Sequence, residues 1–347
     1  DDAVLLEQYK RGELDGVIEE FHQLLRAMDS DPIEVKPNAE RTGGQGVTFH
    51  EPSYARPADL DDRPRLVLTG DSITHGPPSC PNAPWAMAIA RQNPELAVEN
   101  VAWGGIMSMS LLRPADFMAG MPGLQVTLPP PKDIGGDYVC ILIGTNDLMA
   151  MCGNKEFVQM SYVQPLPFPG PCRLPENWET ACKPSISLYE ESVRKIVQEY
   201  KEAGARVAIS TVPMLGQDVS DTFNEKQKVE RSPYLTGKEL AAVARKVAAE
   251  EGCSVLPLFE CMEHCARSQE LPSIKWTPMT FTGRMTSTNM TMQQMYVQTG
   301  KPIPWEDVGP EKGRPHFLFD LVHFNERGGA LHAALVQSWL NAQRSAT

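Results

Sequence analysis

The chain has 347 residues, 41% of them hydrophobic and 22% charged, and its formal net charge at pH 7 is -12. This length and composition suit one large α/β domain with insertions. The negative charge argues against nucleic acid as a partner, because binding to phosphates needs clustered Lys and Arg side chains. The apolar runs are shorter than the about 20 residues of a membrane-spanning helix, so we expect no transmembrane segment.

Residues 1–63 are predicted to form an N-terminal arm outside the main domain. Apolar side chains at spacings of three and four over residues 1–29 predict an amphipathic helix, which should end at the Asp-Ser-Asp-Pro sequence that begins at Asp29. Residues 30–63 are polar and rich in Gly and Pro, so they predict an extended connector. We expect this arm to pack or to dock a partner protein, not to catalyse.

From residue 64 to residue 347, apolar strand patterns alternate with amphipathic helix patterns. The predicted strands cover residues 65–72, 96–103, 138–143, 206–212 and 254–258. The predicted helices cover residues 85–92, 187–203, 235–250 and 328–342. Strands that alternate with helices predict an α/β fold, here a three-layer α/β/α sandwich around a five-stranded parallel sheet.

Two segments, 148–184 and 260–315, interrupt this alternation. Long loops in a compact domain are usually lids or binding loops, so we expect the inserts to select the substrate or to pack on their own domain. The second insert has a Met-rich stretch, which suits an adaptable apolar surface such as an acyl-binding wall. Its methionines are Met279, Met285, Met290, Met292 and Met295.

The chain has eight cysteines, an even number that permits disulfides and favours a secreted or organellar location over a cytosolic one. A single glycosylation sequon begins at Asn289 and points the same way. Cys140 lies in an apolar run and is predicted to be a buried free thiol. Cys261, His264 and Cys265 lack the spacing of a complete metal site, which leaves a disulfide or plain packing.

Four short motifs carry side chains that acyl transfer requires, and we expect them to meet at one edge of the sheet. They are Gly70-Asp71-Ser72, NVAWGG at residues 100–105, GTND at residues 144–147 and DLVH at residues 320–323. Ligands of open α/β sheets bind at the carboxyl ends of the strands. Taken alone, Ser72 is as good a helix cap as a nucleophile, and Asn146-Asp147 without its neighbours favours a simple Asx turn over a site.

In this order and spacing the motifs resemble the SGNH hydrolase superfamily, the GDSL-type esterases and lipases. The resemblance runs from about Arg65 to the C-terminus, interrupted by the two inserts, and excludes the N-terminal arm. It implies the α/β/α sandwich with a flavodoxin-like strand order, and a reaction that needs no metal and no cofactor.

The resemblance also implies a catalytic triad and an oxyanion hole. Ser72 matches the nucleophile, His323 the general base, and Asp320 the carboxylate that orients the imidazole. The oxyanion donors would be the backbone N–H groups of Ser72 and Gly105 and the side-chain amide of Asn146. These assignments predict that acyl groups pass through an ester on Ser72.

Several neighbouring residues compete for these roles. Gly104 replaces Gly105 as donor if the register is shifted by one residue. Asp71 is expected to bond the turn around the serine. His75 is an alternative base, but it lies near a helix N-terminus, where the dipole disfavours an imidazolium. The remaining candidate bases, which have less support, are His264, His316 and His332.

The sequence therefore predicts a serine ester hydrolase that acts on a small-molecule, lipid or glycan ester. The Met-rich insert favours acyl chains, whereas Trp103 beside the oxyanion glycine would suit a sugar ring. Two alternatives stay open: an acyltransferase, and a structural or interaction subunit that keeps the hydrolase fold and docks through its N-terminal helix and inserts.

Overall fold

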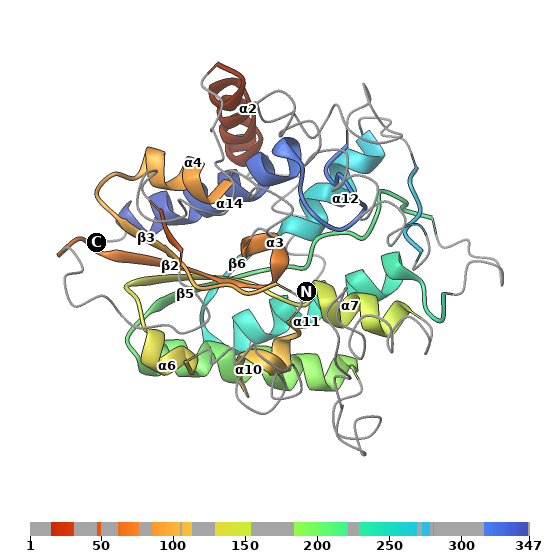
Figure 1. Ribbon diagram of the computed structural model, residues 1–347, viewed down its shortest axis with the longest axis horizontal. Helices are drawn as coiled ribbons and strands as arrows, with labels where there is room; N and C mark the ends of the chain where they lie inside the picture. Colours follow the sequence, from red (N-terminus) through yellow and green to blue (C-terminus); the bar gives the residue numbers. More distant parts are fainter. Residues whose placement is uncertain are drawn as a thin grey trace, which may run out of the picture.

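A parallel β-sheet forms the middle layer of the computed structural model, and helices cover both of its faces (Figure 1). The structure describes residues 15–30, 47–49, 62–75, 85–104, 106–112, 129–153, 184–220, 229–268, 273–277, 280 and 316–345. The strands, in spatial order, are β1 (Val47–Phe49), β3 (Ala97–Asn100), β2 (Arg65–Gly70), β4 (Tyr138–Leu142), β5 (Arg206–Ser210) and β6 (Ser254–Leu256). Each neighbouring pair is parallel.

The five predicted strands are all present, and they lie in the predicted flavodoxin-like order, 2-1-3-4-5 when numbered along the chain. Beside these five, β1 adds a short sixth strand at the edge next to β3. It comes from residues 30–63, which we predicted to be an extended connector. Three residues are too few for an alternating pattern to separate a strand from an extended loop.

The helices divide into two outer layers (Figure 1). One face of the sheet carries α2 (Asp15–Ser30), α4 (Trp85–Gln92), α12 (Leu258–Ser268) and α14 (Glu326–Ser345). The other face carries α6 (Pro131–Ile134), α10 (Ile186–Glu202) and α11 (Pro233–Glu251). Among the helices that the structure describes, none has the length and apolar character needed to cross a membrane.

The predicted N-terminal helix is confirmed from Asp15 to Ser30, and residues 1–14 lie outside the described residues. Its buried side chains include Val17, Phe21 and Leu24, which share one face of the helix. This face packs on α14, so the arm covers the outer layer of the sandwich.

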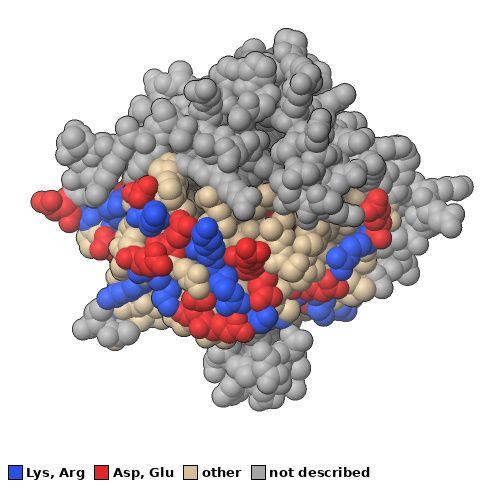
Figure 2. Space-filling model, turned by 90° about the horizontal axis from the view of Figure 1, so that it is seen from below, with Lys and Arg blue, Asp and Glu red and all other residues tan. Residues whose placement is uncertain are grey.

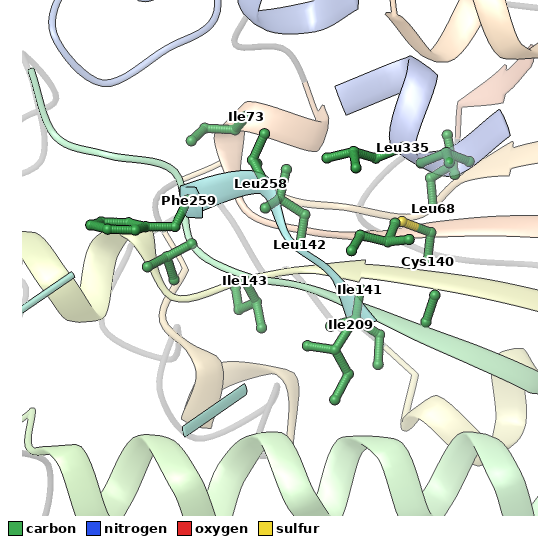
Figure 3. Packing of buried hydrophobic residues seen from close by; sticks show 14 of the residues in the cluster. Leu68, Ile73, Cys140, Ile141, Leu142, Ile143, Ile209, Leu258, Phe259 and Leu335 are labelled. Carbon is green, nitrogen blue, oxygen red and sulfur yellow. The ribbon is translucent and has the colours of Figure 1, made fainter. Parts of the chain in front are cut away.

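Alternate side chains of β4 point into the two halves of the core. Cys140 lies on the α14 side of the sheet, whereas Ile141 and Ile209 lie on the α10 side (Figure 3). A parallel strand that is covered on both faces needs a continuous apolar run, and β4 has one. Cys140 is a buried free thiol, as predicted.

Two helices begin inside or beside the segments that we predicted as inserts. They are α7 (Thr145–Cys152) and α12, and neither was predicted. Cys261 and Cys265 of α12 are buried in the core, and Cys261 is a free thiol, so the disulfide alternative is wrong and these residues pack. The rest of both inserts, including the five methionines and the sequon, lies outside the described residues, apart from residues 153, 184, 273–277 and 280.

The outer surface of α10 and α11 carries charges of both signs. Arg194 contacts Glu190 of its own helix and Glu250 and Glu251 of α11, and Lys246 also contacts Glu190. Figure 2 shows this face, with acidic and basic side chains next to one another. Such exposed pairs each contribute little to stability, and they leave this layer water-facing.

Candidate active site

The turn that carries Ser72 is shaped by contact with the neighbouring strand. Gly70 has φ +153°, and a Cβ at this position would stand 1.9 Å from the carbonyl oxygen of Leu142. Only glycine therefore fits where β2 ends beside β4. Ser72 then opens the short helix α3 (Ser72–His75) at the carboxyl edge of the sheet.

Asp71, not Ser72, caps this helix. The side-chain carboxylate of Asp71 accepts the N–H of Ile73 at 3.0 Å, and the backbone carbonyl of Asp71 accepts the N–H of His75 at 2.9 Å. These are the bonds that an N-cap residue makes. The predicted bonding role of Asp71 in the turn is confirmed, and the hydroxyl of Ser72 is left for another partner.

That partner is His323. The Nε2 atom of His323 lies 2.9 Å from the Ser72 Oγ, and its Nδ1 lies 2.6 Å from Asp320 Oδ2. The other Asp320 oxygen accepts the backbone N–H groups of Val322 and His323, at 3.0 and 2.7 Å. With Nδ1–H donating to the carboxylate, Nε2 is the acceptor that faces the Ser72 hydroxyl. The structure thus brings Ser72, His323 and Asp320 into one hydrogen-bonded series.

The DLVH turn is held by its neighbours. Leu321 has φ +78°, the only non-glycine residue with positive φ in the described part of the chain. Its carbonyl accepts the N–H of Gly216 at 2.9 Å. The ring of Phe319 stacks on the imidazole of His323, with 5.8 Å between centroids, and its N–H donates to the His323 carbonyl. The imidazole is therefore fixed from both the loop after β5 and its own turn.

Two carboxylates set the electrostatics of the imidazole. Burial opposes the charge of His323, but the charge and hydrogen bond of Asp320, together with the charge of Asp71, raise its pKa above the ordinary value. Burial raises the pKa of Asp71 from 3.8 to about 6, although the Ile73 N–H and the charge of His323 act in the opposite direction. This environment favours the imidazolium that forms when His323 takes a proton.

Asn146 comes from the neighbouring strand, β4, through a turn at Gly144. Gly144 has φ +121°, and a Cβ there would stand 2.6 Å from the ring of Tyr189. Asn146 is buried in the first turn of α7, and its side-chain amide donates to the carbonyl of Ile106 at 2.8 Å. Because β2 and β4 are adjacent, this turn leaves the same sheet edge as the turn that carries Ser72.

The predicted glycine donor is only partly tested. Gly105 lies outside the described residues, so its role stays a prediction. A Cβ on Gly104 would stand 3.7 Å from the Ser72 Cβ, which places the loop after β3 directly beside the serine. The backbone N–H of Trp103 donates to the Gly70 carbonyl at 3.0 Å, and the half-buried indole ring of Trp103 packs on His75.

The competing histidines occupy other environments. His75 is buried against Trp103. His332 lies in the core, where its Nε2 is 2.8 Å from the Ser210 Oγ and burial lowers its pKa to about 3. His316 is buried before the DLVH turn, and His264 lies on α12. Among the described residues, His323 is the histidine that bonds the Ser72 hydroxyl.

Sequence reasoning missed one contact of this site. The carboxylate of Asp147 accepts both the N–H and the hydroxyl of Ser108, at 2.9 and 2.7 Å. Both side chains of Asn146-Asp147 thus bond across to the loop after β3, a contact that the alternative of a simple Asx turn does not account for. The sequence marks the acidic residue beside Asn146 but gives no indication of its partner.

Comparisons with known proteins place these features in context. A model of the GDSL-like lipase/acylhydrolase family matches residues 68–331. No curated protein matches the sequence. The fold is similar to three solved structures at low identity. The acetyl xylan esterase AlAXEase is 13% identical, with 79% of this chain and 98% of that chain covered and a TM-score of 0.45. A lipase/acylhydrolase from Enterococcus faecalis is 18% identical, with 81% of this chain and 96% of that chain covered and a TM-score of 0.42. Axe2, an acetylxylan esterase from Geobacillus stearothermophilus, is 14% identical, with 79% of this chain and 93% of that chain covered and a TM-score of 0.43.

Proposed function

Because the chain belongs to the GDSL-like lipase/acylhydrolase family, we propose that it is a carboxylic ester hydrolase that works through a covalent ester on Ser72. The observation that carries the proposal is the series Asp320–His323–Ser72, with hydrogen bonds of 2.6 and 2.9 Å. A hydroxyl within reach of an imidazole that is itself held by a carboxylate is the arrangement of an activated nucleophile.

In the first half of the reaction, the Ser72 Oγ attacks the carbonyl carbon of the ester while His323 Nε2 takes the hydroxyl proton. The C–O bond to the alcohol then breaks, and the imidazolium returns the proton to the leaving oxygen. In the second half, His323 takes a proton from water, whose oxygen attacks the acyl carbon, and the proton goes back to Ser72. The buried Asp320 carboxylate stabilises the imidazolium in both halves.

Each half passes through a tetrahedral intermediate whose oxygen carries negative charge. We assign its stabilisation to the side-chain amide of Asn146 and to the backbone N–H groups of Ser72 and Gly105. Donors fixed in a water-excluded site act strongly on such charge. The bond from Asn146 to the Ile106 carbonyl supports this assignment, because it fixes the plane of the amide before substrate arrives.

The substrate class that the proposal takes is a small-molecule ester. Membership of the family does not identify the substrate more closely than this. An ester with a long acyl chain and an ester of a sugar, both suggested by the sequence, therefore remain competing predictions. The same Ser72 ester would serve an acyltransferase if an alcohol replaced water as the acceptor. Product analysis with and without added alcohol separates these two reactions.

The test is turnover of p-nitrophenyl acetate together with labelling by a fluorophosphonate probe. We expect the parent protein to react with both, and Ser72→Ala to lose label and about 10⁶-fold in kcat. Ser192→Ala, which alters a buried serine of α10, is the matched control and should keep both activities. An unlabelled parent would instead support the structural subunit, and a Ser72→Ala protein as active as the parent would refute the mechanism.

A further inference from the structure

Two consecutive residues of α7 bond to the loop that follows β3. The amide of Asn146 donates to the carbonyl of Ile106 at 2.8 Å. The carboxylate of Asp147 accepts the N–H of Ser108 at 2.9 Å on one oxygen and its hydroxyl at 2.7 Å on the other. Three hydrogen bonds therefore join the first turn of α7 to residues 106–108, although β2 lies between the strands from which these segments come.

The Asp147–Ser108 contact lies fully inside the protein. Asp147 is 2% exposed and Ser108 is 0% exposed. Burial raises the pKa of Asp147 above its ordinary value, and the N–H and hydroxyl of Ser108 offset only part of this rise. A buried carboxylate is tolerated only where donors satisfy it, and bonds to a charged acceptor are shorter and stronger than neutral ones. Ser108 supplies one donor to each oxygen, which fixes both the distance and the orientation of the loop.

We propose that Ser108 and Asp147 are positioning residues for the oxyanion site. They hold the Ile106 carbonyl at the place from which it orients the amide of Asn146. The inference rests on the proposed function, because the amide needs a fixed orientation only if it stabilises charge on the acyl oxygen. A displacement of a catalytic donor by well below 1 Å lowers the reaction rate markedly. The Asp147–Ser108 contact, which we call the clamp, therefore acts on the rate of the chemical step.

The loop that the Asp147–Ser108 bonds hold also lies beside the turn that carries Ser72. A Cβ on Gly104 would stand 3.7 Å from the Ser72 Cβ, and Trp103 donates to the Gly70 carbonyl. The loop is thus tied to the serine turn at one end and to α7 at the other. Removing the α7 tie frees the end that orients Asn146 and leaves the end beside Ser72 in place.

The experiment compares Ser108→Ala with Ser210→Ala. Both serines are 0% exposed. Ser108→Ala loses a side-chain hydrogen bond of 2.7 Å to Asp147, and Ser210→Ala loses one of 2.8 Å to His332 together with a weak one of 3.9 Å to the Cys140 Sγ. Kinetics with p-nitrophenyl acetate should show kcat about 10- to 100-fold lower in Ser108→Ala with little change in KM. Affinity for phenylboronic acid, which forms a tetrahedral adduct with the serine, should fall by a similar factor. Ser210→Ala should keep kcat and boronate affinity while losing a comparable amount of thermal stability.

Asp147→Asn gives a second measurement that keeps the side-chain volume, and it carries the comparison if Ser108→Ala does not fold. The double variant should lose less than the product of the two single losses, because both changes weaken the same contact. Unchanged kcat in a folded Ser108→Ala or Asp147→Asn protein would overturn the inference, as would a rise in KM alone. Loss of activity in Ser72→Ala together with normal kcat in Ser108→Ala would overturn the inference and leave the proposed function standing.

Discussion

The buried carboxyl group of Asp71 is unfavourable to ionise, so its charge lowers the stability of the folded protein. Its carboxyl group is fully buried, and burial raises its pKa from 3.8 to about 6. Its Oδ1 caps α3 through the Ile73 N–H at 3.0 Å. Asp71→Asn keeps the size of the side chain and this acceptor, but it has no proton to release. We therefore predict that Asp71→Asn stabilises the protein at neutral pH.

The magnitude follows from the difference between the two pKa values of Asp71. Each pKa unit corresponds to about 1.36 kcal/mol, so the difference between 3.8 and about 6 amounts to roughly 3 kcal/mol. Below pH 3.8 the group is protonated in both the folded and unfolded chains. Between 3.8 and about 6 the unfolded chain releases the proton and the folded chain keeps it, so the stability of the parent falls across this window.

Urea denaturation of the parent and Asp71→Asn proteins at pH values from about 4 to 8 measures this effect. The free energy of unfolding of Asp71→Asn should exceed that of the parent by little at the acid end and by roughly 3 kcal/mol at the alkaline end. Asp71→Ala should gain about 1 kcal/mol less, because it also loses the cap of α3. A difference between parent and Asp71→Asn that does not change with pH would refute the reasoning.

Three further predictions concern the same part of the molecule. Asp320→Asn removes the carboxylate that raises the pKa of His323, so NMR titration of the ring should show its pKa lowered, and an unchanged midpoint would contradict this cause. Gly216 has φ +66°, and the Cβ of Gly216→Ala would stand 2.3 Å from the Ile274 carbonyl oxygen. The free energy of unfolding of this variant should therefore be lower than that of the parent by more than about 1 kcal/mol, and equal midpoints in urea denaturation would contradict this prediction. Burial raises the pKa of Cys140 to about 12, so a thiol reagent followed by mass spectrometry should modify Cys140 only after unfolding, and labelling of the native protein would contradict its burial.

The central layers of the fold could be predicted because their patterns are continuous. The apolar run at β4 is needed for burial on both faces, and α4 has the bounds that its apolar spacing predicted. The helix α12 was missed because its first residue, Leu258, continues the apolar run of β6 and favours a longer strand. The spacing of Leu258, Cys261, Met262 and Cys265 is nonetheless helical, and it marks the face that the structure buries.

Within the candidate site, the pairing of two groups on one turn could be predicted, whereas the contact between the loops after β3 and β4 could not. Asp320 and His323 are three residues apart, so a single turn brings them together. The contact of Asp147 with Ser108 depends on the paths of two loops that leave strands separated by β2. Local sequence patterns do not encode such a distance, which is set by sheet order and twist.

The hydrogen bond between Ser72 and His323 joins residues that are 251 positions apart in the chain. During synthesis the serine turn leaves the ribosome long before the imidazole does, and domains assemble from the N-terminal side. A growing chain therefore carries Ser72 without its hydrogen-bond partner His323 for most of its synthesis. Contacts between residues this far apart in the chain form slowly during folding. The recovery of hydrolysis after dilution from denaturant would therefore report when the Ser72–His323 contact forms. Under the proposed mechanism, hydrolysis therefore begins only after the two ends of this domain have come together.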